Sequence, residues 1–81
     1  MKAPRPTYEV DGAAIRKIRM SRGIKIADLA RNARISRSYL TRLEIGVRTN
    51  MRPPTYAALR TALELDPEDE QLLAPREPNT E

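Results

Sequence analysis

The chain has no cysteine and no histidine, and this absence limits how its 81 residues can hold a fold. It removes disulfides and nearly every zinc or haem site, the supports on which many very small domains depend. A helical bundle is the architecture that needs the fewest long-range contacts. We therefore expect one compact all-α domain, held by its apolar core alone, with no metal and no cofactor.

The same absences weigh against an enzyme. Without Cys or His the chain has no thiolate nucleophile and no imidazole base, and it has no glycine-rich phosphate loop. Trp and Phe are also absent, so a stacking platform for single-stranded nucleic acid is not expected. No apolar run approaches the roughly 18 residues of a membrane span, and the first residues contain no apolar stretch that could direct secretion. We expect a non-enzymatic, cytoplasmic protein that does not associate with membranes.

Charge is divided sharply along the chain. Residues 12–63 hold twelve Lys or Arg residues against two acids, Asp28 and Glu44, which gives a net charge of +10. Residues 64–81 hold seven acids and one Arg, which gives −6. A compact block with this positive charge attracts polyanions, and nucleic acid is the commonest large one. Arg-rich usage can also reflect genomic base composition, but that would not crowd the acids into one block.

Capping residues and apolar spacing predict three short helices in the first half of the chain. Asp11 can cap the first helix, which Gly23 ends. A second apolar set covers residues 26–33, which is short for a helix. Ser36 can cap a third helix that ends before Gly46.

Two more helices are expected in the second half. Residues 47–54 lack periodicity and end in a proline pair, so they are expected to form a loop, followed by a fourth helix over about 55–65. Asp66 and the proline after it suit the start of a fifth short helix that runs through Leu73. Leu72 and Leu73 would either close the core or form a dimer face, and core closure is the better single hypothesis. No alternating pattern predicts a strand.

Domain boundaries follow from these elements. We expect a flexible N-terminal arm over residues 1–11, one helical domain over 12–73, which the resemblance described next identifies as a DNA-binding domain, and a disordered acidic tail over 74–81. Lys2 and Arg5 on the arm could follow a DNA backbone, although two acids on the same arm cancel their charge.

The sequence from Ile15 to Leu65 resembles the helix-turn-helix proteins of the phage-repressor kind, the Cro/C1-type or xenobiotic-response-element (XRE) family. The resemblance is carried by IRKIRMSRGIKIADLA, then RISRSYLTRLEIG, then LRTALELDPEDEQLL. Ala30 stands where the two motif helices cross closely, Leu40 and Leu43 stand at the buried positions of the recognition helix, and Glu44 begins the segment that ends this helix. The resemblance implies a lambda-repressor-like bundle of about five short helices, with the motif at about residues 26–45. It also implies sequence-specific binding of double-stranded DNA and regulation of transcription, with repression as the expected direction.

Two positions depart from the family pattern. The second helix usually begins with a Gln that touches phosphate, and here it begins with Ile26, which cannot do so. The turn between the motif helices usually holds a left-handed Gly, and here it holds Arg34. A non-Gly residue in that conformation costs about 1 kcal/mol, which a packed motif can tolerate.

Base reading is expected from the outward side of the third helix. If Leu40 faces the core, helical geometry turns four polar residues to the opposite side: Arg37, Ser38, Thr41 and Arg42. An Arg can donate two hydrogen bonds to guanine O6 and N7, and the Thr methyl group can meet a thymine methyl group. Any surface helix turns such residues outward, so the hypothesis depends on the motif around them.

Phosphate contacts are expected from five residues: Arg19, Lys25, Tyr39, Arg48 and Arg52. The loop cations could instead serve solubility, and Tyr39 could instead pack against the first helix. The resemblance places Arg19 and Glu44 with their charged groups converging, so we expect a structural clamp that also orients Arg19 toward a phosphate.

The expected partners are double-stranded DNA and a second copy of the chain, at least on DNA. Two other classes of function stay open. One is the DNA-binding antitoxin component of a toxin–antitoxin pair, whose acidic C-terminal segment would bind a separate protein. The other is an adaptor that binds only protein.

Overall fold

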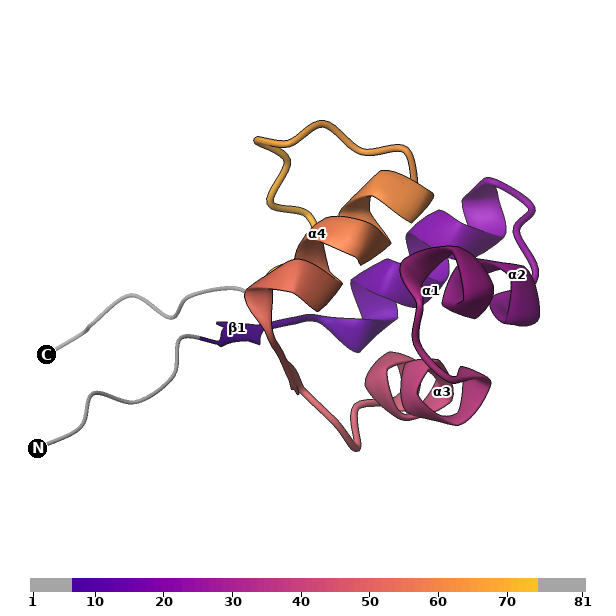
Figure 1. Cartoon of the computed structure of the whole chain (residues 1–81), viewed down its shortest axis with the longest axis horizontal. Helices are drawn as coiled ribbons and strands as arrows, with labels where there is room; N and C mark the ends of the chain where they lie inside the picture. The colour runs from indigo at the N-terminus through magenta and orange to yellow at the C-terminus, as the bar shows by residue number, and fades with distance from the viewer. Residues whose placement is uncertain (1–6, 75–81) are drawn as a thin grey trace, which may run out of the picture.

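The computed structural model describes residues 7–74, and this part of the chain forms four helices around one core with a two-stranded sheet at one side (Figure 1). The helices are α1 (Gly12–Ser21), α2 (Ile26–Ala33), α3 (Arg37–Ile45) and α4 (Pro53–Ala62). The strands are β1 (Tyr8–Glu9) and β2 (Asn50–Met51), which pair antiparallel. Lys2, Arg5 and the expected tail from residue 75 lie outside the described residues.

The caps of α1 and α3 are those the sequence predicts. The Asp11 carboxylate accepts the backbone N–H of Ala13 at 3.1 Å, and the Ser36 hydroxyl accepts that of Tyr39 at 3.0 Å. Gly46 ends α3 in the left-handed region at φ +88°. Side-chain oxygens at these positions satisfy amides that have no partner inside the helix, so the capping signals set where the helices begin.

The turn between α2 and α3 is closed by Arg34. This residue has φ +63°, so it adopts the left-handed conformation expected of the family's turn despite its side chain. The next amide, that of Ile35, donates to the Ala30 carbonyl oxygen at 3.0 Å, which ties the turn back to α2.

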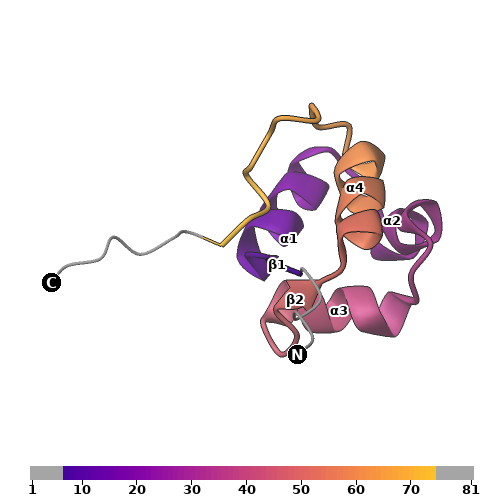
Figure 2. The ribbon, with the colours of Figure 1, turned by 60° about the vertical axis from the view of Figure 1, so that its left-hand side comes forward.

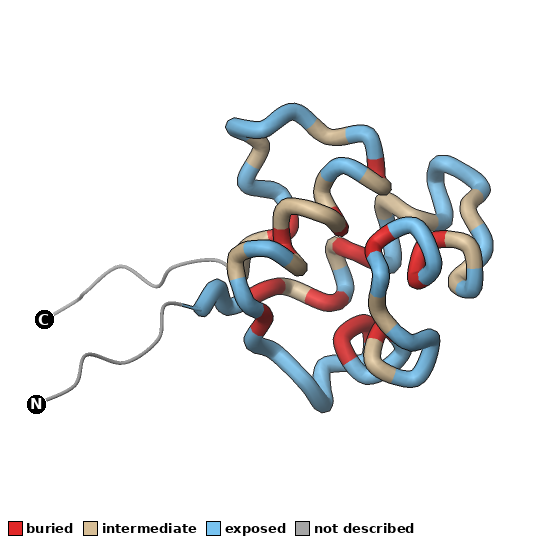
Figure 3. Tube along the Cα trace, in the orientation of Figure 1, coloured by how far each residue is buried: buried red, intermediate tan, exposed pale blue. Residues whose placement is uncertain are grey.

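The core gathers apolar side chains from all four helices, from β2 and from the segments that precede α1 and follow α4. Figure 3 shows where the buried residues lie along the chain. Its largest fully buried side chains are Ile15, Leu29, Leu40, Leu43, Met51, Leu59, Leu63 and Leu72. Leu72 therefore closes the core and is not available as a dimer contact, whereas Leu73 is half-buried.

The prediction of a fifth helix from Asp66 to Leu73 is wrong. Residues 63–74 form a strap of turns and extended backbone that leads from the end of α4 to the bridge between Leu73 and Val10 (Figure 2). Glu64, which follows the C-cap of α4, has φ +63°, so the chain leaves the helical conformation there. The Asp69 carboxylate accepts the backbone and side-chain N–H groups of Gln71 at 3.0 and 2.8 Å, which competes with helical bonding. A helix would also stack Asp66 over Glu70, a like-charge pair. The extended strap instead buries Leu72.

The expected loop and the purely α class also need correction. The proline pair does not close a loop but opens α4 at Pro53, where the missing N–H groups belong to the first helical turn. Within the same stretch Asn50–Met51 form β2, so a small sheet joins the helices. Strands of two residues are too short to leave an alternating pattern in the sequence.

Tyr56 anchors α4 against the strap. Its ring is buried, its hydroxyl donates to the Asp69 carbonyl oxygen at 3.3 Å, and the Arg60 guanidinium lies 5.4 Å from the ring centroid. Burial raises the pKa of the Tyr56 phenol, although Arg60 acts in the opposite direction. None of the helices within residues 7–74 is both long and apolar enough to cross a bilayer.

Candidate nucleic-acid interface

The outward side of α3 carries the four residues expected to read bases. Arg37, Ser38, Thr41 and Arg42 are all exposed, while Leu40 on the inner side is fully buried. This division is set by the core, because the inner leucines lock the rotation of the helix about its axis. The N-terminal two turns of α3 therefore present two guanidinium groups and two hydroxyls on one continuous surface.

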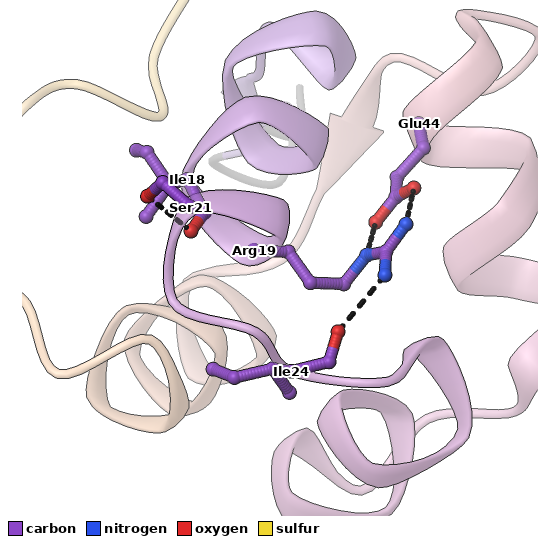
Figure 4. Close-up of polar contacts among 5 residues, drawn as sticks. All are labelled: Ile18, Arg19, Ser21, Ile24 and Glu44. Atoms are coloured by element: carbon purple, nitrogen blue, oxygen red, sulfur yellow. Dashed lines mark hydrogen bonds and ion pairs between the residues drawn. The ribbon is translucent and has the colours of Figure 1, made fainter.

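A clamp joins α3 to α1 and to the start of the motif (Figure 4). The Arg19 guanidinium donates to both carboxylate oxygens of Glu44, with Nε–Oε2 at 2.7 Å and Nη2–Oε1 at 3.0 Å. Its third nitrogen donates to the Ile24 carbonyl oxygen at 2.9 Å. The side chains of Arg19 and Glu44 are only 14% and 4% exposed. A charge-assisted bidentate pair in this setting fixes the direction of both side chains.

Three of the expected phosphate-contacting residues line one hollow beside α3. The hollow has a volume of about 300 Å³, and its lining includes Thr7, Tyr39, Arg48, Asn50, Arg52 and Thr55. Its lining in the described chain contains no acid. Because α4 begins at Pro53, the positive end of its dipole also points to this part of the surface.

Tyr39 organises the hollow. Its hydroxyl donates to the Asn50 carbonyl oxygen at 3.2 Å, and the Arg48 guanidinium lies 5.6 Å from the centroid of its ring. The half-buried ring also packs against the core, so this residue both fills space and holds the segment after α3. From Ile45, the last residue of α3, to Asn50 the chain is exposed (Figure 3).

The remaining expected contact, Lys25, lies apart from the hollow. It is the exposed N-cap of α2, next to the Ile24 carbonyl that Arg19 holds. Ile26, the first residue of α2, is half-buried and packs against the core, so its departure from the family pattern contributes to packing instead of a polar contact.

The acids of residues 64–70 lie on the other side of the molecule from α3. Figures 1 and 2 place the strap that follows α4 above the helices and α3 below them. The cations of α3 and of the hollow therefore lie away from the acids of residues 64–70. Elsewhere the basic and acidic blocks meet, since Arg22 Nη1 lies 3.6 Å from Glu64 Oε1.

Two residues that shape this interface, Gly12 and Asn50, were not predicted from the sequence. Gly12 lies where α1 meets the C-terminal end of α3, so closely that a Cβ atom would overlap the carbonyl oxygen of Leu43. The sequence did contain a signal for Gly12, because no turn requires a glycine at the first position of a helix, and such a glycine indicates a close approach of another segment. Asn50 contributes through its backbone carbonyl oxygen, which accepts the Tyr39 hydroxyl. Every residue has such a carbonyl, so the residue type gives no signal.

An exposed recognition helix held against a preceding helix by a tight left-handed turn defines a helix-turn-helix protein. The sequence model of the family described as "Helix-turn-helix domain" matches residues 12–73, and the chain belongs to this family. The resemblance seen in the sequence is thereby confirmed.

Two solved proteins are similar in structure. The restriction-modification controller protein C.AhdI from Aeromonas hydrophila is 32% identical, with a TM-score of 0.64, over 69% of this chain and 83% of that one. The clp gene regulator ClgR from Corynebacterium glutamicum is 33% identical in each of two crystal structures, with TM-scores of 0.62 and 0.61. The matches to ClgR cover 67% and 68% of this chain, and 56% and 70% of the respective ClgR chains. No curated protein sequence matches the chain significantly.

Proposed function

We propose that this protein regulates transcription by placing α3 in the major groove of a specific double-stranded DNA site. The class of function, DNA-binding regulation of transcription, follows from membership of the helix-turn-helix family and from similarity to two proteins named as a controller and a gene regulator. We expect the protein to act in the cytoplasm, to carry out no catalysis and to repress its targets.

The observation that carries the proposal is the joint position of two surfaces. The outward side of α3 offers side chains that can read base edges, and the hollow beside it offers two Arg side chains without an opposing acid in its described lining. In protein–DNA interfaces base contacts specify the sequence and phosphate contacts fix the register. The two surfaces would supply these two kinds of contact together.

Each residue then has a role. Arg37, Ser38, Thr41 and Arg42 would read bases. Lys25, Tyr39, Arg48 and Arg52 would contact phosphates. All three guanidinium nitrogens of Arg19 already donate to Glu44 and Ile24, so we assign this residue chiefly to positioning α3 and the start of α2. Its small exposed edge is left for a phosphate.

The base-reading role predicts a selective loss of affinity. Arg37→Ala or Arg42→Ala should weaken binding to the cognate site by about 1–3 kcal/mol and relax the preference for one base pair, because a bidentate contact to guanine is lost. Binding to random DNA should change much less. Titration of both DNAs with each variant provides the measurement.

Arg48→Ala is the matched control, since it removes the same charge from the hollow instead of from α3. It should weaken binding to cognate and random DNA alike and lower the salt slope by about 1. If Arg37→Ala and Arg42→Ala lost equal affinity for both DNAs, these two residues would contact phosphates and not bases.

Two copies should bind one site. A single short recognition helix reads only a few base pairs, so two half-sites about one helical turn, or roughly 34 Å, apart are expected, related by a two-fold axis. With roughly 6–10 phosphates neutralised, affinity should fall by about 10³–10⁵-fold from 50 to 200 mM salt. Footprinting and stoichiometry on a selected site test this, and one copy protecting a single half-site at full affinity would contradict it. The dimer can form on DNA only, so a free monomer is compatible with the proposal.

A further inference from the structure

We propose that the segment Thr7–Val10 is a positioning element for the DNA contacts of this protein. It holds the span between α3 and α4, and with it Arg48 and Arg52, in the geometry that receives a phosphate. The inference rests on the proposed function and deepens it. The match to the helix-turn-helix family covers residues 12–73, so the segment lies ahead of the matched residues.

One side of the segment is bonded to the span that follows α3. Tyr8 pairs with Met51 and Glu9 with Asn50 in the antiparallel sheet, and the Val10 N–H donates to the Thr49 carbonyl oxygen at 2.8 Å. Three consecutive residues of the span are thus paired, between the two residues that carry its cations. Thr7 itself forms part of the lining of the hollow.

The other side of the segment is fixed to the body of the domain. The Ala74 N–H donates to the Glu9 carbonyl oxygen at 2.9 Å, and Val10 forms a bridge with Leu73. The Val10 side chain is 3% exposed, and the ring of Tyr8 lies 4.6 Å from that of Tyr56, centroid to centroid. The segment therefore connects the DNA-facing span to the strap and to α4, so the span is not a free loop.

Pairing of the two strands affects the position of Arg48 through Tyr39. The carbonyl that accepts its hydroxyl belongs to Asn50, whose backbone the sheet holds, and the ring supports the Arg48 guanidinium. If the strand opened, the acceptor would move and the two Arg side chains would have to be ordered on binding, which costs affinity. The base-reading side chains would not move, because α3 is fixed separately by the core and by the Arg19–Glu44 pair.

A reversible cross-link can test this. Glu9 and Asn50 are directly opposed and exposed, and the chain has no cysteine of its own, so Glu9→Cys with Asn50→Cys creates a single cross-strand disulfide. Opposed residues in an antiparallel pair have Cα atoms about 4.5–5.5 Å apart, within the range of a disulfide. Tyr8→Ala is added to remove the ring contact with Tyr56 and so loosen the strand. The oxidised and reduced forms of this triple variant are each other's control.

The reduced triple variant should bind the selected site about fivefold or more weakly than the oxidised one, with a smaller salt slope. Oxidation should restore both. The preference for the selected site over a site with one substituted base pair should be the same in the two forms, a result that general unfolding would not give. Hydrogen exchange at the Val10 amide shows whether the strand is open in the reduced form.

Equal affinity of the two forms, with the Val10 amide exchanging freely in the reduced one, would overturn the proposal. A loss of base preference in parallel with affinity would also overturn it, since the segment would then act only on overall stability. If the reduced form does not fold, Tyr8→Leu replaces Tyr8→Ala and the same comparison decides. Failure of the proposed function is seen separately, as a wild-type protein with no preference between selected and random DNA.

Discussion

Gly12→Ala is expected to destabilise the domain by about 3 kcal/mol or more, close to the largest effects that single substitutions produce. The new Cβ atom would overlap the carbonyl oxygen of Leu43, which is backbone and cannot rotate away. Relief requires α1 and α3 to move apart, and such a movement would also stretch the Arg19–Glu44 pair. Urea denaturation followed by circular dichroism measures the change in the free energy of unfolding.

Gly23→Ala is the control for this substitution. Gly23 has φ +69°, but a Cβ atom there would meet nothing within 4 Å. It should therefore cost only about 1 kcal/mol, the strain of a left-handed alanine. Similar costs at the two positions would show that α1 and α3 do not approach each other as closely as described.

Arg19→Ala and Glu44→Ala should each lower the free energy of unfolding by about 3 kcal/mol, because each leaves a poorly hydrated charge without its partner. The double variant should lose less than the sum, since removing both charges relieves that penalty. A coupling energy of about 1–3 kcal/mol is expected from a double-mutant cycle of urea denaturations.

The Asp28–Arg31 pair on α2 provides the comparison. Its side chains also meet at 2.8 Å, but they are 46% and 73% exposed. The same cycle on this pair should give less than about 1 kcal/mol, because water screens an exposed pair and the ordering of two long side chains offsets part of the attraction. A coupling at Arg19 and Glu44 as small as this one would show that their burial contributes little.

The first three helices could be predicted because their signals are local. Asp11 and Ser36 bond to amides two or three residues away, and Gly46 ends its helix through its own φ angle. The four exposed polar residues of α3 could also be predicted locally, because burial of Leu40 fixes which side of the helix faces solvent. The convergence of Arg19 and Glu44, in contrast, came from the family resemblance.

The second half of the chain could not be predicted in this way because distant residues decide it. Asp66 has the features of a helix cap, yet burial of Leu72 and the bridge between Leu73 and Val10 favour an extended strap. The hollow depends on β1 and β2 meeting across some forty residues of sequence. Single residues with roles predicted from the sequence, such as Tyr39 and Arg48, were identified without their common setting.

Selection of bound sites from random double-stranded DNA by the wild-type protein at low salt shows whether α3 reads a DNA sequence. One defined sequence should be enriched, and the protein should bind it far more tightly than the starting pool, because α3 carries side chains that distinguish base pairs. A final pool as random as the first, bound with unchanged affinity, would contradict the claim that this surface reads DNA sequence.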